Sequence, residues 1–155
     1  MSTMQSEHFT QALYTLLSET LDKVQGYYLD KNTSLFETLQ DITAEKASIP
    51  VGGQCASLAA QVKHVAFYLD VTVKSVHDPN YRADWGEIWR TVERVTPEEW
   101  QAIQDELRAS YQRILLLIES TPAWGEDEIG GAIAIVAHTA YHLGEIRQAL
   151  CTLRG

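Results

Sequence analysis

Apolar residues recur along most of the chain at spacings of three and four residues, the period of one face of an amphipathic α-helix. Four long stretches follow this pattern, at 9–24, 57–76, 97–121 and 127–153. Two short helices are also expected, one after Ser34, where Glu37 stands in capping-box spacing, and one around 86–92. Strand-like alternation is almost absent. The sequence therefore predicts an all-α protein whose four long helices form a four-helix bundle.

Several residues mark where these helices begin and end. Thr96, Pro97 and Glu99 combine an N-cap, a first-turn proline and a capping box at the start of the third long helix. Gly26 is expected to end the first helix, and Pro50 with the two glycines that follow it interrupts the chain before the second. The connections are long enough for crossovers, so simple up-and-down order does not follow from the pattern alone.

Length and charge limit what the protein can be. The 155 residues suit one domain, and we expect residues 1–155 to form a single unit that needs no metal to fold. The net charge of −9, without basic clusters, excludes nucleic acid and an anionic membrane surface as partners. Membrane-span and signal-peptide patterns are absent. Cys55 and Cys151 match no disulfide or CxxC pattern, so we expect a cytoplasmic protein with reduced cysteines in structural positions.

The histidines carry the strongest chemical signal. His138 and His142 lie one turn apart in the last predicted helix, so both imidazoles project from one face and can share an ion. Thr139 stands where a zinc protease carries its glutamate, which excludes HExxH. Small apolar residues precede the pair and favour an interior position, and His64, at the edge of the second helix's apolar stripe, is the third candidate ligand. The alternatives are a hydrated histidine pair and a lone His64 bonded to a tyrosine hydroxyl.

Three neutral imidazoles leave coordination positions open on a divalent ion, as in catalytic or substrate-binding sites. Imidazole ligands suit zinc or nickel, and iron less well. The second nitrogen of each ring needs a hydrogen-bond partner, and helical spacing makes Glu145, Gln61 and Tyr68 candidates. The predicted site is thus a three-histidine metal centre on two helices.

Other residues have two interpretations each. Gly131 and Ala134 share a stripe with His138, and either leave room for a ligand or allow close helix packing. His8 and His77 are expected to be solvated or helix-end residues. The tryptophans either line a pocket mouth or pack at the ends of the bundle: Trp85, Trp89, Trp100 and Trp124.

The stretch KHVAFYL around His64, followed by HTAYHLGEIRQAL at the end of the chain, resembles the DinB-like (DinB/YfiT) superfamily. DWGEIWRTVERVTPEEW also resembles the connection before that family's third helix, and the likeness covers about 9–153. It implies a homodimeric four-helix bundle with long crossover connections, in which His64, His138 and His142 bind a divalent metal. Members of known chemistry are thiol-dependent transferases and isomerases whose metal lowers the pKa of a thiol. Glu145 stands where relatives often carry glutamine.

Two functions follow from this sequence. The first is a metal-dependent enzyme of hydrolase or thiol-S-transferase type, which activates water or a low-molecular-weight thiol for attack on a small-molecule substrate. The second is a non-catalytic dimeric bundle that binds a metal or a small ligand. No general base is evident, since Glu145 could equally orient a ligand. The two functions differ in whether the ion faces a pocket.

Overall fold

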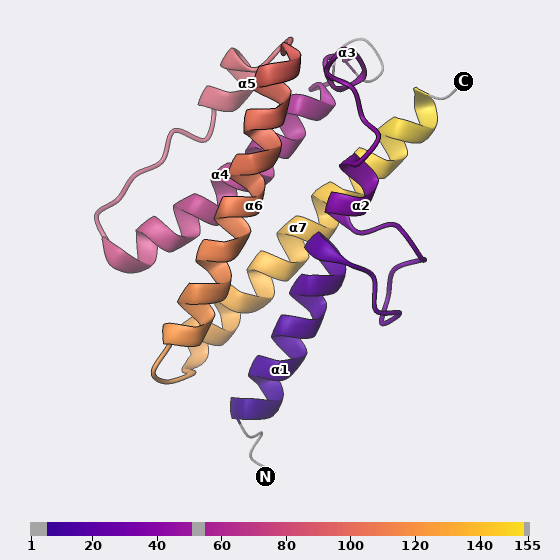
Figure 1. The fold of residues 1–155 in the computed structure, drawn as a ribbon. Helices are drawn as coiled ribbons and strands as arrows, with labels where there is room; N and C mark the ends of the chain where they lie inside the picture. Colours follow the sequence, from indigo (N-terminus) through magenta and orange to yellow (C-terminus); the bar gives the residue numbers. More distant parts are fainter. Residues whose placement is uncertain (1–5, 51–54, 154–155) are drawn as a thin grey trace.

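The computed structural model describes residues 6–50 and 55–153, and this part of the chain is helical, with no β-structure beyond one bridge between Pro50 and Ser57. The all-α prediction is therefore confirmed. Figure 1 shows the helical elements of the described residues in chain order: α1 (Ser6–Leu17), the π-helical turn η1 (Ser18–Asp22), α2 (Leu35–Leu39), α3 (Ala44–Ala47), α4 (Leu58–His77), α5 (Glu87–Thr91), α6 (Pro97–Ser120) and α7 (Glu126–Thr152).

The long helices α1, α4, α6 and α7 surround one cluster of buried apolar side chains. Helix α4 packs chiefly against α6, and α7 packs against both α4 and α1. The predicted apolar stripes form this core, and their completely buried members include Leu17, Leu58, Val62, Val65, Leu69, Leu107 and Ile114. Helices α4 and α7 run in opposite directions (Figure 1). The start of α4 therefore lies beside the second half of α7, which decides where the functional site forms.

The first helix ends differently from the sequence expectation. It widens into η1 and stops at Lys23, so the end is not set by Gly26, which lies in the following loop with a φ of 88°. The carboxylate of Glu19 is fully buried and accepts backbone N–H groups from that loop. Its donors are Gln25, Tyr27, Tyr28 and Leu29. This side chain folds the loop back onto the helix end, an interaction that apolar periodicity does not encode.

The predicted helix starts agree closely with the structure. Ser34 and Thr96 both form complete capping boxes, and α4 and α7 begin within one residue of the expected positions. The short α5 is present, although Trp85 precedes it. Helix α3 was not predicted, because its four residues are too few to show an apolar period. Its N-terminus is capped by the side-chain oxygen of Thr43. The glycines at 52 and 53 lie outside the described residues.

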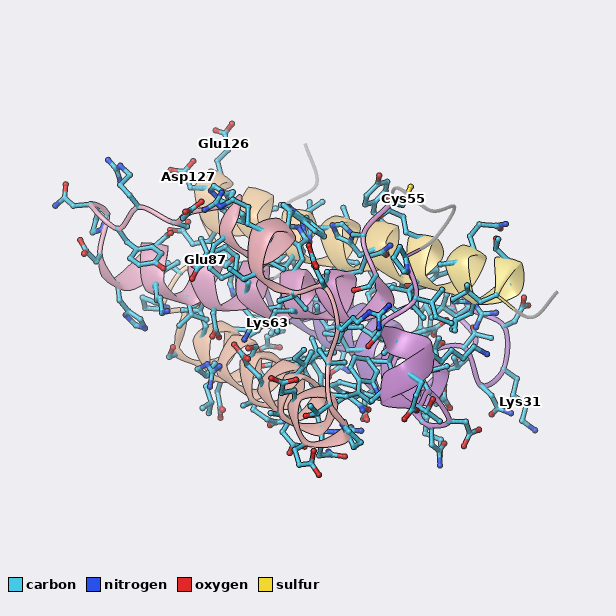
Figure 2. The ribbon with its side chains drawn as sticks, turned by 90° about the horizontal axis from the view of Figure 1, so that it is seen from above. Lys31, Cys55, Lys63, Glu87, Glu126 and Asp127 are labelled. Atoms are coloured by element: carbon cyan, nitrogen blue, oxygen red, sulfur yellow. The ribbon has the colours of Figure 1, made fainter. Side chains whose placement is uncertain are left out.

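The surface corrects one expectation about the cysteines. Cys55 and Cys151 are both free and exposed, so the prediction that they occupy structural positions is wrong. Figure 2 shows the Cys55 sulfur at the edge of the molecule. In the described part of the chain, no helix combines the length and apolar character needed to cross a membrane.

Candidate metal centre

The three predicted metal ligands lie together between α4 and α7. On α4, His64 lies one residue before Val65 of the buried stripe, and its imidazole lies against the two histidines of α7. The imidazole centroid of His64 lies 5.2 Å from that of His138 and 4.8 Å from that of His142. The centroids of His138 and His142 are 4.5 Å apart. One nitrogen of each ring lies within 4.8 Å of the other two. This cluster could hold a metal ion.

Burial keeps the three imidazoles neutral. His64 and His142 are only 9% and 8% exposed, and His138 is half-buried. Removal from water lowers the pKa of His138 to about 4, and the adjacent His142 and His64 add to the effect. Burial also lowers the pKa of His64 and His142, although the carboxylate of Glu145 opposes the shift in both. Neutral imidazole is the form that binds a metal, so the cluster is ready for one at neutral pH.

Buried polar atoms without hydrogen-bond partners are concentrated here. Among the described residues they include Nδ1 of His64 and of His138, Oε1 of Gln61 and Oγ1 of Thr139. Leaving such an atom unpaired costs about 1–3 kcal/mol, and most native proteins contain few of them. These four belong to neighbouring turns of α4 and α7. A divalent ion held by the three histidines could satisfy the imidazole nitrogens among these atoms.

Glu145 is the predicted hydrogen-bond partner that the structure places next to a ligand. Its Oε2 lies 2.8 Å from Nδ1 of His142, one turn away on α7. A carboxylate there favours the tautomer with the proton on Nδ1, which leaves Nε2 with the lone pair that a metal needs. Of the other candidates, Gln61 has a free buried oxygen, and Tyr68 contacts His138 through its ring rather than its hydroxyl.

An aromatic ring lies against each imidazole and restricts its orientation. The three aromatic residues belong to three different helices, α4, α5 and α7, so each imidazole packs against a different helix. They are Tyr68 stacked on His138 (centroids 3.6 Å apart, planes at 10°), Trp89 against His64 (4.8 Å, 32°) and Tyr141 against His142 (5.0 Å, 76°).

Trp85 and Trp89 reach the site from the connection between α4 and α6. The ring of Trp85 lies 6.4 Å from His64 and packs edge-on against Phe67 at 5.5 Å. Both indoles have one side on the site and one side in solvent, since Trp85 is 46% and Trp89 42% exposed. Trp89 lines a cavity next to the site, whereas Trp85 packs against Phe67 and Tyr68. The spacing of four between the two tryptophans and their place after the His64 helix were the available sequence signals.

The histidines are sheltered, but they lie close to open space. A cavity of about 630 Å³ is lined by Ala60 and Trp89, among others. Ala60 is one turn before His64 on α4, and Trp89 lies on the His64 ring. Trp89 thus lies between this cavity and the ring of His64.

The remaining candidate residues lie elsewhere. His8 and His77 are exposed, near the start of α1 and at the end of α4, as expected. Close packing at Gly131 is ruled out, because a Cβ there would meet no atom within 4 Å. The other tryptophans are packing residues: Trp100 donates its indole N–H to the carbonyl of Ile42, and Trp124 packs against Phe9.

A set of inward-facing neutral histidines with one carboxylate partner is chemically suited to a borderline metal with nitrogen ligands. A zinc ion bonds imidazole nitrogen at about 2.0–2.1 Å, so ligand nitrogens that now lie up to 4.8 Å apart would move closer together around a bound ion. No protein-family model matches the chain, and comparison with curated proteins and with solved structures gave no significant match.

Proposed function

We propose that the protein is a metal-dependent enzyme in which His64, His138 and His142 hold a divalent cation, zinc or nickel in preference to iron. The observation that carries this proposal is the coincidence of three neutral imidazoles with unpaired buried polar atoms. Three protein ligands leave a coordination position for substrate. The substrate is a small molecule, and the chemistry is of hydrolase or thiol-S-transferase type.

A divalent cation in this site would supply the Lewis acidity that lowers the pKa of a coordinated water or thiol. The chain's own residues position the ligands and handle hydrogen bonds. The carboxylate of Glu145, 2.8 Å from Nδ1 of His142, favours the tautomer with the proton on that nitrogen, and the ring of Tyr68 stacks on His138. The free Oε1 of Gln61 is available to accept a hydrogen bond from a bound ligand.

The sequence resemblance leads us to propose membership of the DinB-like superfamily. The corresponding fold is a four-helix bundle of α1, α4, α6 and α7 with crossover connections. The long strap from 78 to 96, which contains only the short α5, supports this arrangement. A cytoplasmic location agrees with the two free, exposed cysteines.

A non-catalytic metal-binding bundle is the alternative function, and a specific observation favours it. Five cavities formed by the described residues are lined by side chains other than the three histidines. A buried ion without access to substrate would have a structural or sensing role. Exchange of a small coordinating ligand at the metal distinguishes the two functions, because only an enzyme needs an exchangeable position.

Metal content tests the site directly. We expect the purified, zinc-reconstituted protein to retain one ion per chain after dialysis, and His138→Ala to lose it, because two imidazoles hold zinc much more weakly than three. His77→Ala is the matched control, since His77 is exposed and lies outside the cluster. Elemental analysis with circular dichroism provides the readout. A folded wild-type protein that retains no ion after reconstitution with zinc and with nickel would refute the proposal.

We also propose that the chain pairs with a second copy. Residues 129–144 of α7 contain no Asp, Glu, Lys or Arg, yet one face of this segment is open to solvent. The exposed face consists of Gly130, Gly131, Ile133, Ala134, Ala137, Tyr141 and Gly144. Beside it, α1 and α7 form an apolar hollow of about 210 Å³. Uncharged exposed faces of this kind are typical of protein interfaces.

A further inference from the structure

The rim of the metal site is aromatic on the side that meets solvent. Trp85 and Trp89 rise from the strap after α4, with 46% and 42% of their surfaces exposed. Phe67 extends this surface behind Trp85. Two half-exposed indoles beside a cluster of polar nitrogens resemble the aromatic lining of a small-molecule site.

Charged groups at this rim do not favour a charged ligand body. Lys63 forms an ion pair with Glu106, and Arg90 pairs with Asp84 at 2.5 Å. Both cations next to the site in sequence are therefore already engaged. The carboxylate of Glu145 faces His142, and Glu93 and Arg94, which have opposite charges, line the cavity beside Trp89, so neither sign of charge predominates. Recognition at the rim thus depends on contact with flat apolar faces rather than on ion pairing.

We infer that the ligand of this site carries an uncharged aromatic body beside its metal-binding group, and that Trp85 and Trp89 are the specificity-determining residues. The inference rests on the proposed metal site and names its substrate class. The indoles of Trp89 and Trp85 lie 4.8 Å and 6.4 Å from the imidazole of His64, so the proposed ligand body extends from the metal toward these two rings. Aromatic contacts contribute beyond the area that they bury, which favours a ring over an aliphatic body.

A pair of hydroxamates tests the inference on the full-length, zinc-reconstituted protein. Benzohydroxamate and acetohydroxamate present the same metal-binding group and differ in a phenyl and a methyl body. Calorimetry gives both dissociation constants, and tryptophan fluorescence reports contact with the indoles. We expect benzohydroxamate to bind about tenfold more tightly, the ratio that one well-formed aromatic contact supplies. It should also quench tryptophan fluorescence more strongly.

Variants assign the preference to the two tryptophans. In Trp85→Ala and Trp89→Ala the affinity ratio should fall to about threefold or less, whereas Trp89→Phe should keep most of it. Trp124→Ala is the matched control, because Trp124 packs against Phe9 and away from the site. Using the ratio within each variant removes any change in metal affinity, and zinc content is measured in each.

The outcomes separate this inference from the proposed function. Equal affinities in a zinc-loaded wild-type protein would overturn the aromatic preference and leave the metal site standing. A preference that survives in both alanine variants would overturn the role of Trp85 and Trp89. A protein that takes up no zinc would overturn both proposals. A zinc-loaded protein that binds neither hydroxamate would overturn the inference and favour the non-catalytic bundle.

Discussion

Glu19 is a buried carboxylate with a structural task. Burial alone would raise its pKa, but hydrogen bonds from the backbone N–H groups of Gln25, Tyr27, Tyr28 and Leu29 outweigh burial and hold the pKa below the ordinary value. We expect Glu19→Gln to lower the free energy of unfolding at pH 7 by about 2–3 kcal/mol. The N–H₂ group that replaces one carboxylate oxygen cannot accept hydrogen bonds from the backbone N–H groups. Chemical denaturation measures the difference.

The pH dependence of the same variant has a definite sign. A depressed folded-state pKa stabilises the protein above the ordinary glutamate pKa, and this stabilisation disappears as the pH falls through the folded-state value. The gap between wild type and Glu19→Gln should therefore shrink on acidification below about pH 4.5. Glu93→Gln, at an exposed position, serves as control. A gap that stays constant down to the acid transition would show that the Glu19 charge contributes nothing.

At the level of single residues, the contacts that could be predicted are those in which helical spacing determines where a side chain points. The i, i+4 spacing placed His138 and His142 on one face, and Glu145 one turn further met its expected partner. Spacing could not identify the contacts of Trp89, because they depend on how a strap outside the regular helices folds back over α4. The capture of a loop by Glu19 was missed for the same reason.

Helix ends show how much one element depends on its neighbours. Ser34 accepts the N–H of Glu37 and also donates its hydroxyl to the carbonyl of Asp22 in a fully buried position, whereas Thr96 caps α6 at the surface. We expect Ser34→Ala to cost about 2 kcal/mol and Thr96→Ala about 1 kcal/mol, because only the first also removes a second hydrogen bond, the one from the buried Ser34 hydroxyl to the carbonyl of Asp22.

Urea denaturation of both variants gives the comparison. Thr96→Ser retains the capping oxygen and should remain close to wild type. Equal losses for Ser34→Ala and Thr96→Ala would mean that the bond to Asp22 adds nothing beyond the cap.

Long elements were predictable because each buries one continuous apolar stripe, which fixes the helical period over many residues. The stripe of α6 from Trp100 to Ile118 is buried in the structure as its spacing indicated. Short or irregular elements contain too few apolar positions to fix a period in this way. Helix α3 has four residues, and η1 buries the consecutive residues Glu19, Thr20 and Leu21, which a one-sided α-helical stripe does not anticipate.

For the whole molecule, the proposed pairing must overcome a net charge of −9 on each copy. The uncharged face of 129–144 is where two copies can approach with least repulsion. We expect light scattering to give twice the chain mass of 17.4 kDa, and the dimer to strengthen with added salt, because salt screens the repulsion between copies.

A charge placed on that face tests the pairing and the independence of the metal site together. Ala137→Arg should yield a folded monomer, since an arginine in an apolar interface is costly to desolvate, whereas Ala102→Arg on the exposed side of α6 should leave the dimer intact. All three histidines belong to one chain, so the Ala137→Arg monomer should still retain one zinc ion.

A wild-type protein that is monomeric at about 100 μM would refute the pairing. Loss of zinc from a folded monomer would instead show that the second copy completes the site, because the histidines alone would then be insufficient to hold the ion.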